Sequence, residues 1–163
     1  MRRKLRPLLA LIAFVIMTGG VFLFSVTVTV FEVKNLDHPR TLRIRVSPPE
    51  PFSLFYTHSI YNEPVTEEFE IGKEEIVLKG VRTTHAGVME YYGFDEVKPF
   101  HAMDKSLPRP LIVKRGMREG QGLIIKDRTL YLNSLGEKGD RIQLSVSTLP
   151  LGSYLFSMLS KET

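Results

Sequence analysis

The stretch "FSLFYTHSIYNEPVTEEFEI", residues 52–71, has the pattern of two strands joined by a tight turn. Apolar and polar residues alternate on both sides of "YNEP", as they do in half-buried strands. If residues 61–64 form the loop, His58 lies directly opposite Glu67. Directly opposed residues of an antiparallel pair are about 5 Å apart at Cβ. The sequence therefore predicts that an imidazole and a carboxylate meet on the apolar face of this hairpin.

The rest of the chain after the first apolar run continues this strand pattern. Short β-rich runs separated by turn residues lie at 25–33, 41–47, 74–83, 111–115, 122–127, 129–132 and 141–148. The glycine-rich "GMREGQG" at 116–122 is predicted to be a hairpin turn rather than a phosphate-binding loop. No helical period is long enough to supply the crossovers of a parallel sheet. We therefore expect an all-β fold over residues 25–150, an antiparallel β-sandwich or barrel-like domain.

Two segments depart from the strand pattern. Residues 84–110 are long, mixed and rich in aromatic side chains, which is typical of a functional loop in a compact domain. Residues 151–163 form a C-terminal amphipathic tail with apolar residues at helical spacing. This tail is too short to span a bilayer, so it is expected either to pack on the sheet or to lie on a membrane surface.

The N-terminus begins with a cationic cap followed by a long apolar run. Arg2, Arg3, Lys4 and Arg6 precede the segment Leu8–Val30, which contains no charged residue. A helix of this length, at about 1.5 Å per residue, reaches across a hydrocarbon core of about 30 Å. The pattern predicts that residues 1–24 are an uncleaved transmembrane helix of a single-pass protein of the cell membrane. By the positive-inside rule its N-terminus is cytoplasmic and the β domain extracytoplasmic.

Two other interpretations of this N-terminal segment remain open. A cleaved signal peptide would use the small residues Thr18-Gly19-Gly20 as its cleavage site. The new N-terminus would then begin with the apolar residues Val21–Phe24. A buried core helix is the second alternative, and the one-sided placement of the cations disfavours it.

Composition excludes several classes of protein. The net charge is +4, with 22 Lys and Arg against 18 Asp and Glu, and four of the cations lie in the first six residues. The remainder is balanced, so it lacks the cationic surplus with which a nucleic-acid-binding domain neutralises phosphates. There is no cysteine, which excludes disulfides, thiolate zinc sites, a cysteine nucleophile and a lipoprotein anchor.

Three interpretations compete for the predicted pair His58 and Glu67. The pair fixes the hairpin register, or it belongs to a binding site, or it takes part in catalysis or metal binding. For a metal the pair supplies only two ligands, so the loop 84–110 would have to add a third from His85, Glu90 or His101. No HExxH or similar run supports this third interpretation.

Ser59 directly follows His58, and neighbouring strand residues point to opposite faces, which argues against a serine nucleophile activated by this histidine. There is also no Gly-x-Ser-x-Gly elbow, Walker loop or dinucleotide fingerprint. The sequence therefore indicates no cofactor.

The runs "FYTHSIYNEPVTEEFEI" and "VLKGVRTTHAGVMEYYGF" resemble the domain-of-unknown-function family eighteen-fifty. Its hallmark is a Tyr-Thr-His-Ser-hydrophobic run, then Pro-Val, a Glu before an aromatic residue, and an Ala-Gly element. The matching positions are His58, Ser59, Pro64, Val65, Glu67, Ala86 and Gly87. The resemblance covers residues 25–150, and Val88-Met89-Glu90 stand where the family often has a further Gly or Pro.

The resemblance implies a small secreted or membrane-anchored protein with no established activity. Such proteins are frequently encoded beside TRAP transporters of the TAXI type, which use an extracytoplasmic solute receptor. We therefore expect an accessory or binding module that contacts the transporter's membrane subunit or its solute receptor. The alternative is an extracytoplasmic, metal-assisted enzyme that uses His58 and Glu67. The expected binding residues are His58, Ser59, Glu67, His85, Gly87 and Tyr91.

Overall fold

The computed structural model describes residues 2–159, with side chains from Ala10 onward. The chain divides into a helical unit and a β unit. The helical unit contains the described residues up to Thr29 and from Thr148 onward, and the β unit is Val30–Ser147.

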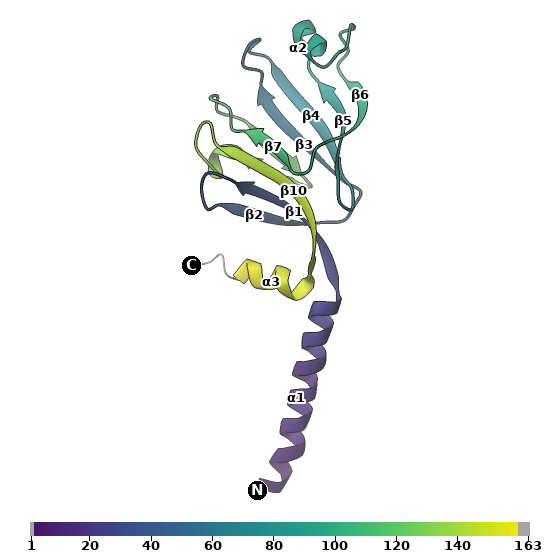
Figure 1. Cartoon of the computed structure of the whole chain (residues 1–163), viewed down its shortest axis with the longest axis vertical. Coiled ribbons are helices and arrows are strands. Elements are labelled where there is room, and N and C mark those ends of the chain that lie inside the picture. Colours follow the sequence, from purple (N-terminus) through teal and green to yellow (C-terminus); the bar gives the residue numbers. More distant parts are fainter. Residues whose placement is uncertain (1, 160–163) are drawn as a thin grey trace. The chain divides into compact units, whose positions relative to one another are not determined.

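The strands form two antiparallel sheets (Figure 1). The four-stranded sheet has the order β2 (Thr41–Val46), β1 (Thr27–Asn35), β10 (Arg141–Pro150), β7 (Leu111–Lys114). The six-stranded sheet has the order β6 (His101–Ser106), β5 (Ile76–Arg82), β4 (Pro64–Ile71), β3 (Glu50–Thr57), β8 (Gly122–Ile125), β9 (Arg128–Tyr131). The 3₁₀ turn η1 (Leu132–Ser134) follows β9.

Both sheets contribute side chains to one hydrophobic core. The rings of Phe31 on β1 and Phe52 on β3 lie 4.9 Å apart, and Phe52 stacks on Phe69 of β4 at 4.8 Å. Phe31, Ile71 and Leu144 are completely buried. These inward positions follow the period of two that the sequence shows. The prediction of antiparallel β structure is therefore confirmed, but the structure is mostly β with a few helices rather than all-β.

The register of the β3–β4 hairpin differs from the prediction. Leu54, not His58, lies opposite Glu67, and Tyr56 lies opposite Val65. The predicted direct pairing of His58 with Glu67 is therefore wrong. The assignment of faces is unaffected, because the shift is an even number of residues and so keeps Glu67 on the apolar face.

The turn chemistry explains this difference in register. Asn62 has φ of 57°, and Asn adopts this left-handed conformation more readily than most residues. The Asn62 amide donates to the His58 carbonyl at 2.9 Å, and the His58 amide donates to the Glu63 carbonyl at 2.8 Å. The loop is thus Ser59–Asn62, two positions earlier than predicted, and Pro64 begins the second strand.

Two other predicted features are wrong. The segment 84–110 is not irregular throughout, because it contains the helix α2 (Ala86–Tyr91) and the edge strand β6. The segment 116–122 is not a hairpin turn, because β7 pairs with β10 whereas β8 pairs with β3 and β9 in the other sheet. This segment therefore carries the chain from one sheet to the other.

The helical unit contains α1 (Arg2–Ser25) and α3 (Leu151–Leu159). The two helices are joined where the Leu151 amide donates to the Val26 carbonyl at 2.7 Å. Among the residues whose side chains are described, Ala10 to Leu159, no helix is long and apolar enough to cross a membrane. The predicted cationic cap, Arg2 to Arg6, and the apolar residues up to Leu9 lie outside the residues whose side chains are described.

Candidate functional site

Glu67 lies at the centre of a small cluster of polar groups on the apolar face of the six-stranded sheet. Tyr92, just after α2, donates its hydroxyl hydrogen to Glu67 Oε1. The Tyr56 hydroxyl, on the neighbouring strand β3, lies 3.3 Å from the same oxygen. The two tyrosine hydroxyl oxygens are 2.8 Å apart. Among the described residues, the carboxyl group thus has two tyrosines as hydrogen-bond partners and no cationic partner.

The surroundings of this cluster change its proton affinities. Burial raises the pKa of Glu67 above its ordinary value, and the hydrogen bonds from Tyr92 and Tyr56 only partly offset this effect. Burial, together with the nearby Glu67 charge, raises the pKa values of Tyr56 and Tyr92 well above their ordinary value. Both hydroxyls therefore keep their protons and remain hydrogen-bond donors at neutral pH.

His58 has a buried ring nitrogen that makes no hydrogen bond to the described residues. Its Nδ1 atom is one of two buried side-chain nitrogen or oxygen atoms without a hydrogen-bond partner among the described residues. The His58 ring stacks on Tyr61 at 5.1 Å and meets the edge of Tyr91 at 5.9 Å. Aromatic contacts therefore hold the ring, and no hydrogen bond satisfies Nδ1. A buried polar group in this condition marks a candidate for ligand binding.

His85 and Gly87 have roles in building this region. His85 Nδ1 accepts a hydrogen bond from the Gly87 amide at 3.2 Å, which caps the start of α2. The Tyr61 ring lies 4.6 Å from the His85 ring and packs over Gly87. A Cβ atom at Gly87 would come within 2.6 Å of the Tyr61 ring. Both residues thus bring α2 against Tyr61 of the β3–β4 loop.

A cavity of about 560 Å³ lies beside this cluster. Its volume falls in the range typical of small-molecule sites. Of the six predicted binding residues, His58, Ser59, Glu67 and Tyr91 line the cavity, while His85 and Gly87 do not. The rest of the lining comes from β3, from the end of β7 and from the segment that joins β7 to β8: Leu54, Tyr56, Thr57, Val113, Lys114, Gly116, Met117, Arg118, Glu119 and Gln121.

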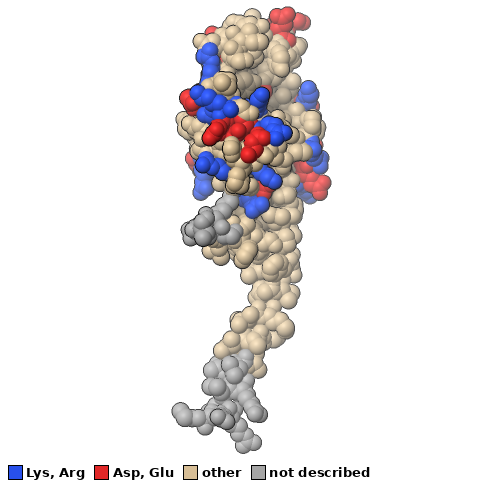
Figure 2. Space-filling view, turned by 60° about the vertical axis from the view of Figure 1, so that its left-hand side comes forward, with Lys and Arg blue, Asp and Glu red and all other residues tan. Residues whose placement is uncertain are grey.

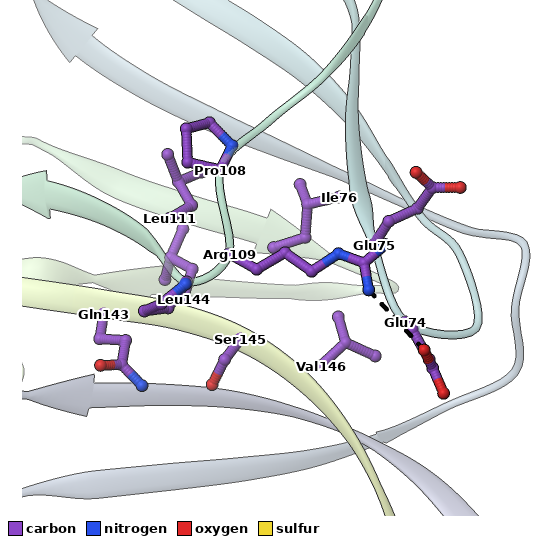
Figure 3. A pocket seen from close by; sticks show the side chains of 11 residues that line it. Glu74, Glu75, Ile76, Pro108, Arg109, Leu111, Gln143, Leu144, Ser145 and Val146 are labelled. Carbon is purple, nitrogen blue, oxygen red and sulfur yellow. Dashed lines mark ion pairs between the residues drawn. The ribbon is translucent and has the colours of Figure 1, made fainter.

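A second, smaller cavity of about 250 Å³ lies between β10 and the start of β5. Figure 3 shows Arg109 extended toward Glu74, and the guanidinium Nη1 lies 3.7 Å from the carboxylate Oε2. The Glu75 carboxylate accepts a hydrogen bond from Ser106 at 3.1 Å. Because the charged groups of this cavity already have partners, it is the weaker candidate for a polar ligand.

The metal-assisted alternative lacks a ligand set. Among the described residues, no group of three His, Cys, Asp or Glu side chains lies close enough to hold a metal ion. His101 stacks on Phe94 at 4.1 Å, and its Nε2 accepts a hydrogen bond from the Lys98 amide. The suggested third ligands therefore do not join His58 and Glu67 around one point.

Several lining residues were not predicted. Tyr56 lines the cavity and was missed, and so was Tyr92, which does not line the cavity but donates a hydrogen bond to Glu67. Lys114 and Arg118 were missed because residues 116–122 were interpreted as a hairpin turn. Tyr56 is two residues before His58, so the alternation of strand residues puts it on the face predicted for His58 and Glu67, and this one residue was within reach of sequence reasoning.

Comparisons with known proteins returned no match. No family model matches the chain, and neither a curated protein nor a solved structure is significantly similar to it.

Proposed function

We propose that the chain is an extracytoplasmic binding module that holds a small solute in the cavity beside Glu67. The observation that carries this proposal is the state of two groups on the cavity wall. The Glu67 carboxyl has no cationic partner, and the buried His58 Nδ1 has no hydrogen-bond partner among the described residues. Polar groups that serve only the fold are normally satisfied by the fold. A ligand with hydrogen-bonding groups would satisfy both.

The proposed location is the cell membrane, with α1 as the point of attachment. Large apolar side chains at consecutive positions, Phe14, Val15, Ile16 and Met17, are each at least 59% exposed. Consecutive residues of a helix point to all sides of it, so no one face of α1 is polar. In Figure 2 the part of α1 that is not drawn in grey shows no charged side chain. On the β unit, positively and negatively charged side chains are interspersed. The absence of a spanning helix was found among the residues with described side chains, which leave out the first residues of α1, up to Leu9. With these residues added from the sequence, we propose a single-pass topology with a cytoplasmic N-terminus and an extracytoplasmic β unit.

The proposed partner is a TAXI-type TRAP transporter, through its membrane subunit or its solute receptor. This part of the proposal rests on the family resemblance of the hairpin and of the Ala86-Gly87 element. The cavity and α2 lie together in the β unit, where a receptor could deliver or accept a solute.

Binding is tested with the full chain in detergent and a library of sugars, organic acids, amino acids, polyols and polyamines. We expect at least one solute class to raise the melting temperature. Glu67→Gln should abolish this shift, whereas Glu68→Gln should retain it. Glu68 is the neighbouring residue on the opposite face of β4 and pairs with Arg82. No solute-dependent shift, or an equal shift in both variants, would count against the proposal.

Membrane attachment and partner are tested separately. Alkaline carbonate should leave the full chain in the membrane pellet, and external protease should reach the β unit only from the extracytoplasmic side. A photo-crosslinking residue at the exposed Tyr91 should capture a TRAP subunit or receptor, whereas one at Tyr131 on β9 should not. Release by carbonate would contradict the anchor, and equal capture from both positions would contradict the docking surface.

A further inference from the structure

The inner wall of the cavity carries a carboxyl group, Glu67, that has no cationic partner among the described residues. Within the described residues, the hydrogen-bond partners of Glu67 are the hydroxyls of Tyr56 and Tyr92. Within the described part of the chain, no lysine or arginine forms an ion pair with this carboxyl group. A cationic group that entered the cavity would therefore meet an acceptor that the fold has not neutralised.

The outer wall carries uncompensated cations. Lys114 and Arg118 are both exposed and line the same cavity. Arg118 donates to the neutral side-chain oxygen of Asn62. The other carboxylate of the lining, Glu119, is already engaged by Arg115 at 3.0 Å and Lys138 at 3.5 Å. Among residues 10–159, no ion pair neutralises Lys114 or Arg118.

Aromatic rings stand beside the inner carboxyl group. Tyr91 contacts the His58 ring at 5.9 Å and the Tyr92 ring at 5.5 Å, and both Tyr91 and Tyr56 line the cavity. The faces of such rings attract ammonium groups. The aromatic wall thus strengthens the preference for a cationic group at the Glu67 end.

We propose that the cavity binds a zwitterion of the amino-acid class, with its ammonium group at Glu67 and the tyrosines and its carboxylate at Lys114 and Arg118. This inference rests on the proposed binding function and names its ligand class. A simple carboxylate would leave Glu67 without a cation, and a simple amine would be repelled by Lys114 and Arg118. Only a ligand with both charges compensates both walls at once.

The test is a matched series of ligands titrated calorimetrically into the full chain in a neutral detergent. The zwitterions are glycine, β-alanine, 4-aminobutyrate, 6-aminohexanoate, alanine and leucine. Each is compared with the carboxylate that lacks its amino group and the amine that lacks its carboxylate. We expect the best zwitterion to bind at least about tenfold more tightly than either partner molecule, the usual scale for a compensated charge pair.

Variants assign the two ends of the ligand. Glu67→Gln should reduce the affinity for the zwitterion to the affinity measured for the matching compound that lacks the amino group. Lys114→Gln and Arg118→Gln, both at exposed positions that tolerate substitution, should reduce it to that for the amine. Glu68→Gln should change neither affinity, because Glu68 is paired with Arg82 outside the cavity.

The outcomes separate this inference from the function on which it rests. Equal affinity for a zwitterion and its carboxylate overturns the inference. The same conclusion follows if no zwitterion binds while another solute class still gives a Glu67-dependent melting shift, and the binding function then stands. If no solute of any class gives a Glu67-dependent shift, both are overturned.

Discussion

Two carboxylates of the β unit, Asp140 and Glu67, have opposite surroundings. Asp140 precedes β10 and accepts hydrogen bonds from the Asn35 side chain at 2.7 Å and the Glu137 amide at 2.8 Å. The hydrogen bond from Asn35 and, to a smaller extent, the one from the Glu137 amide hold the pKa of Asp140 below its ordinary value. Glu67 has only tyrosine hydroxyls, and burial raises its pKa. One site stabilises the charged carboxylate, and the other disfavours it.

The difference shows which site serves the fold. Asn35 uses both its amide hydrogens, toward Asp140 and the Leu135 carbonyl, and its oxygen accepts from the amides of Asp37 and His38. Its hydrogen-bonding capacity is therefore filled. Glu67 lies on a cavity wall and its burial is not compensated. We interpret the Asp140 region as a structural junction and the Glu67 region as a site that a ligand completes.

The largest effect is expected from Asn35→Ala. This change removes the side-chain donor of the Leu135 carbonyl and one of the two donors of the Asp140 carboxylate, and it removes the acceptor of two loop amides. Loss of such a buried network costs about 3 kcal/mol of unfolding free energy. Urea denaturation measures it.

Asn133→Ala is the matched control, because Asn133 is exposed in η1. It should change the unfolding free energy by less than about 0.5 kcal/mol. Similar losses in the two variants would show that the junction does not contribute specifically to stability.

The second prediction concerns pH. The folded-state pKa of Glu67 is raised, so its contribution to stability is full below its unfolded value of 4.5 and is lost as the pH rises through the folded value. Glu67→Gln should therefore gain stability relative to the native chain as pH increases above 4.5. The pKa of Asp140 is lowered from 3.8, so the stability lost in Asp140→Asn should diminish as the pH falls below 3.8.

Thermal unfolding from pH 3 to pH 8 measures both profiles. As the pH rises, Glu67→Gln should become more stable relative to the native chain, and Asp140→Asn should become less stable relative to it. If both differences rose with pH, or if the Glu67→Gln profile ran parallel to that of the native chain, the contrast between the two sites would be lost.

Most strands could be predicted from the sequence, because the alternation of apolar and polar residues is a local signal. This signal was not sufficient for β6, "HAMDKS", because an edge strand with little apolar alternation owes its place to its pairing with β5. The path of residues 116–122 was equally hidden, since a glycine-rich segment looks alike whether it reverses one hairpin or joins two sheets. This is why Arg118 was missed at the site.

The site itself was partly predictable. Alternate residues of a strand share a face, so the sequence placed Glu67 on the apolar face of β4. This assignment is correct although the predicted register was wrong. The register itself depended on the conformation of Asn62, because a left-handed residue at this position closes a loop at Ser59–Asn62 rather than the predicted loop at residues 61–64. The partnership of Glu67 with Tyr92 depended on α2, a six-residue helix too short to show a clear period.

A smaller effect is expected from Tyr92→Phe. The ring remains to pack against the core, while the hydroxyl contacts to Glu67 and Tyr56 are removed. The net loss should be about 1 kcal/mol of unfolding free energy, the usual value for a hydrogen bond. Because a bond that lowers the pKa of Glu67 is gone, the Glu67-dependent loss of stability should extend to higher pH. Tyr131→Phe on β9 is the exposed control, and an equal loss there would refute the role assigned to the Tyr92 hydroxyl.

The smallest effect is expected from Glu68→Gln, and it tests whether the contrast lies in the cavity rather than in β4 as a whole. Glu68 pairs with Arg82 across the outer face of the sheet, where both side chains are partly exposed and water screens the pair. Its loss should cost about 0.5 kcal/mol or less, and the cost should disappear in high salt. A larger, salt-independent loss would mean that the outer face of β4 is as sensitive as the inner one. The special status of Glu67 would then reflect its strand and not the cavity that it lines.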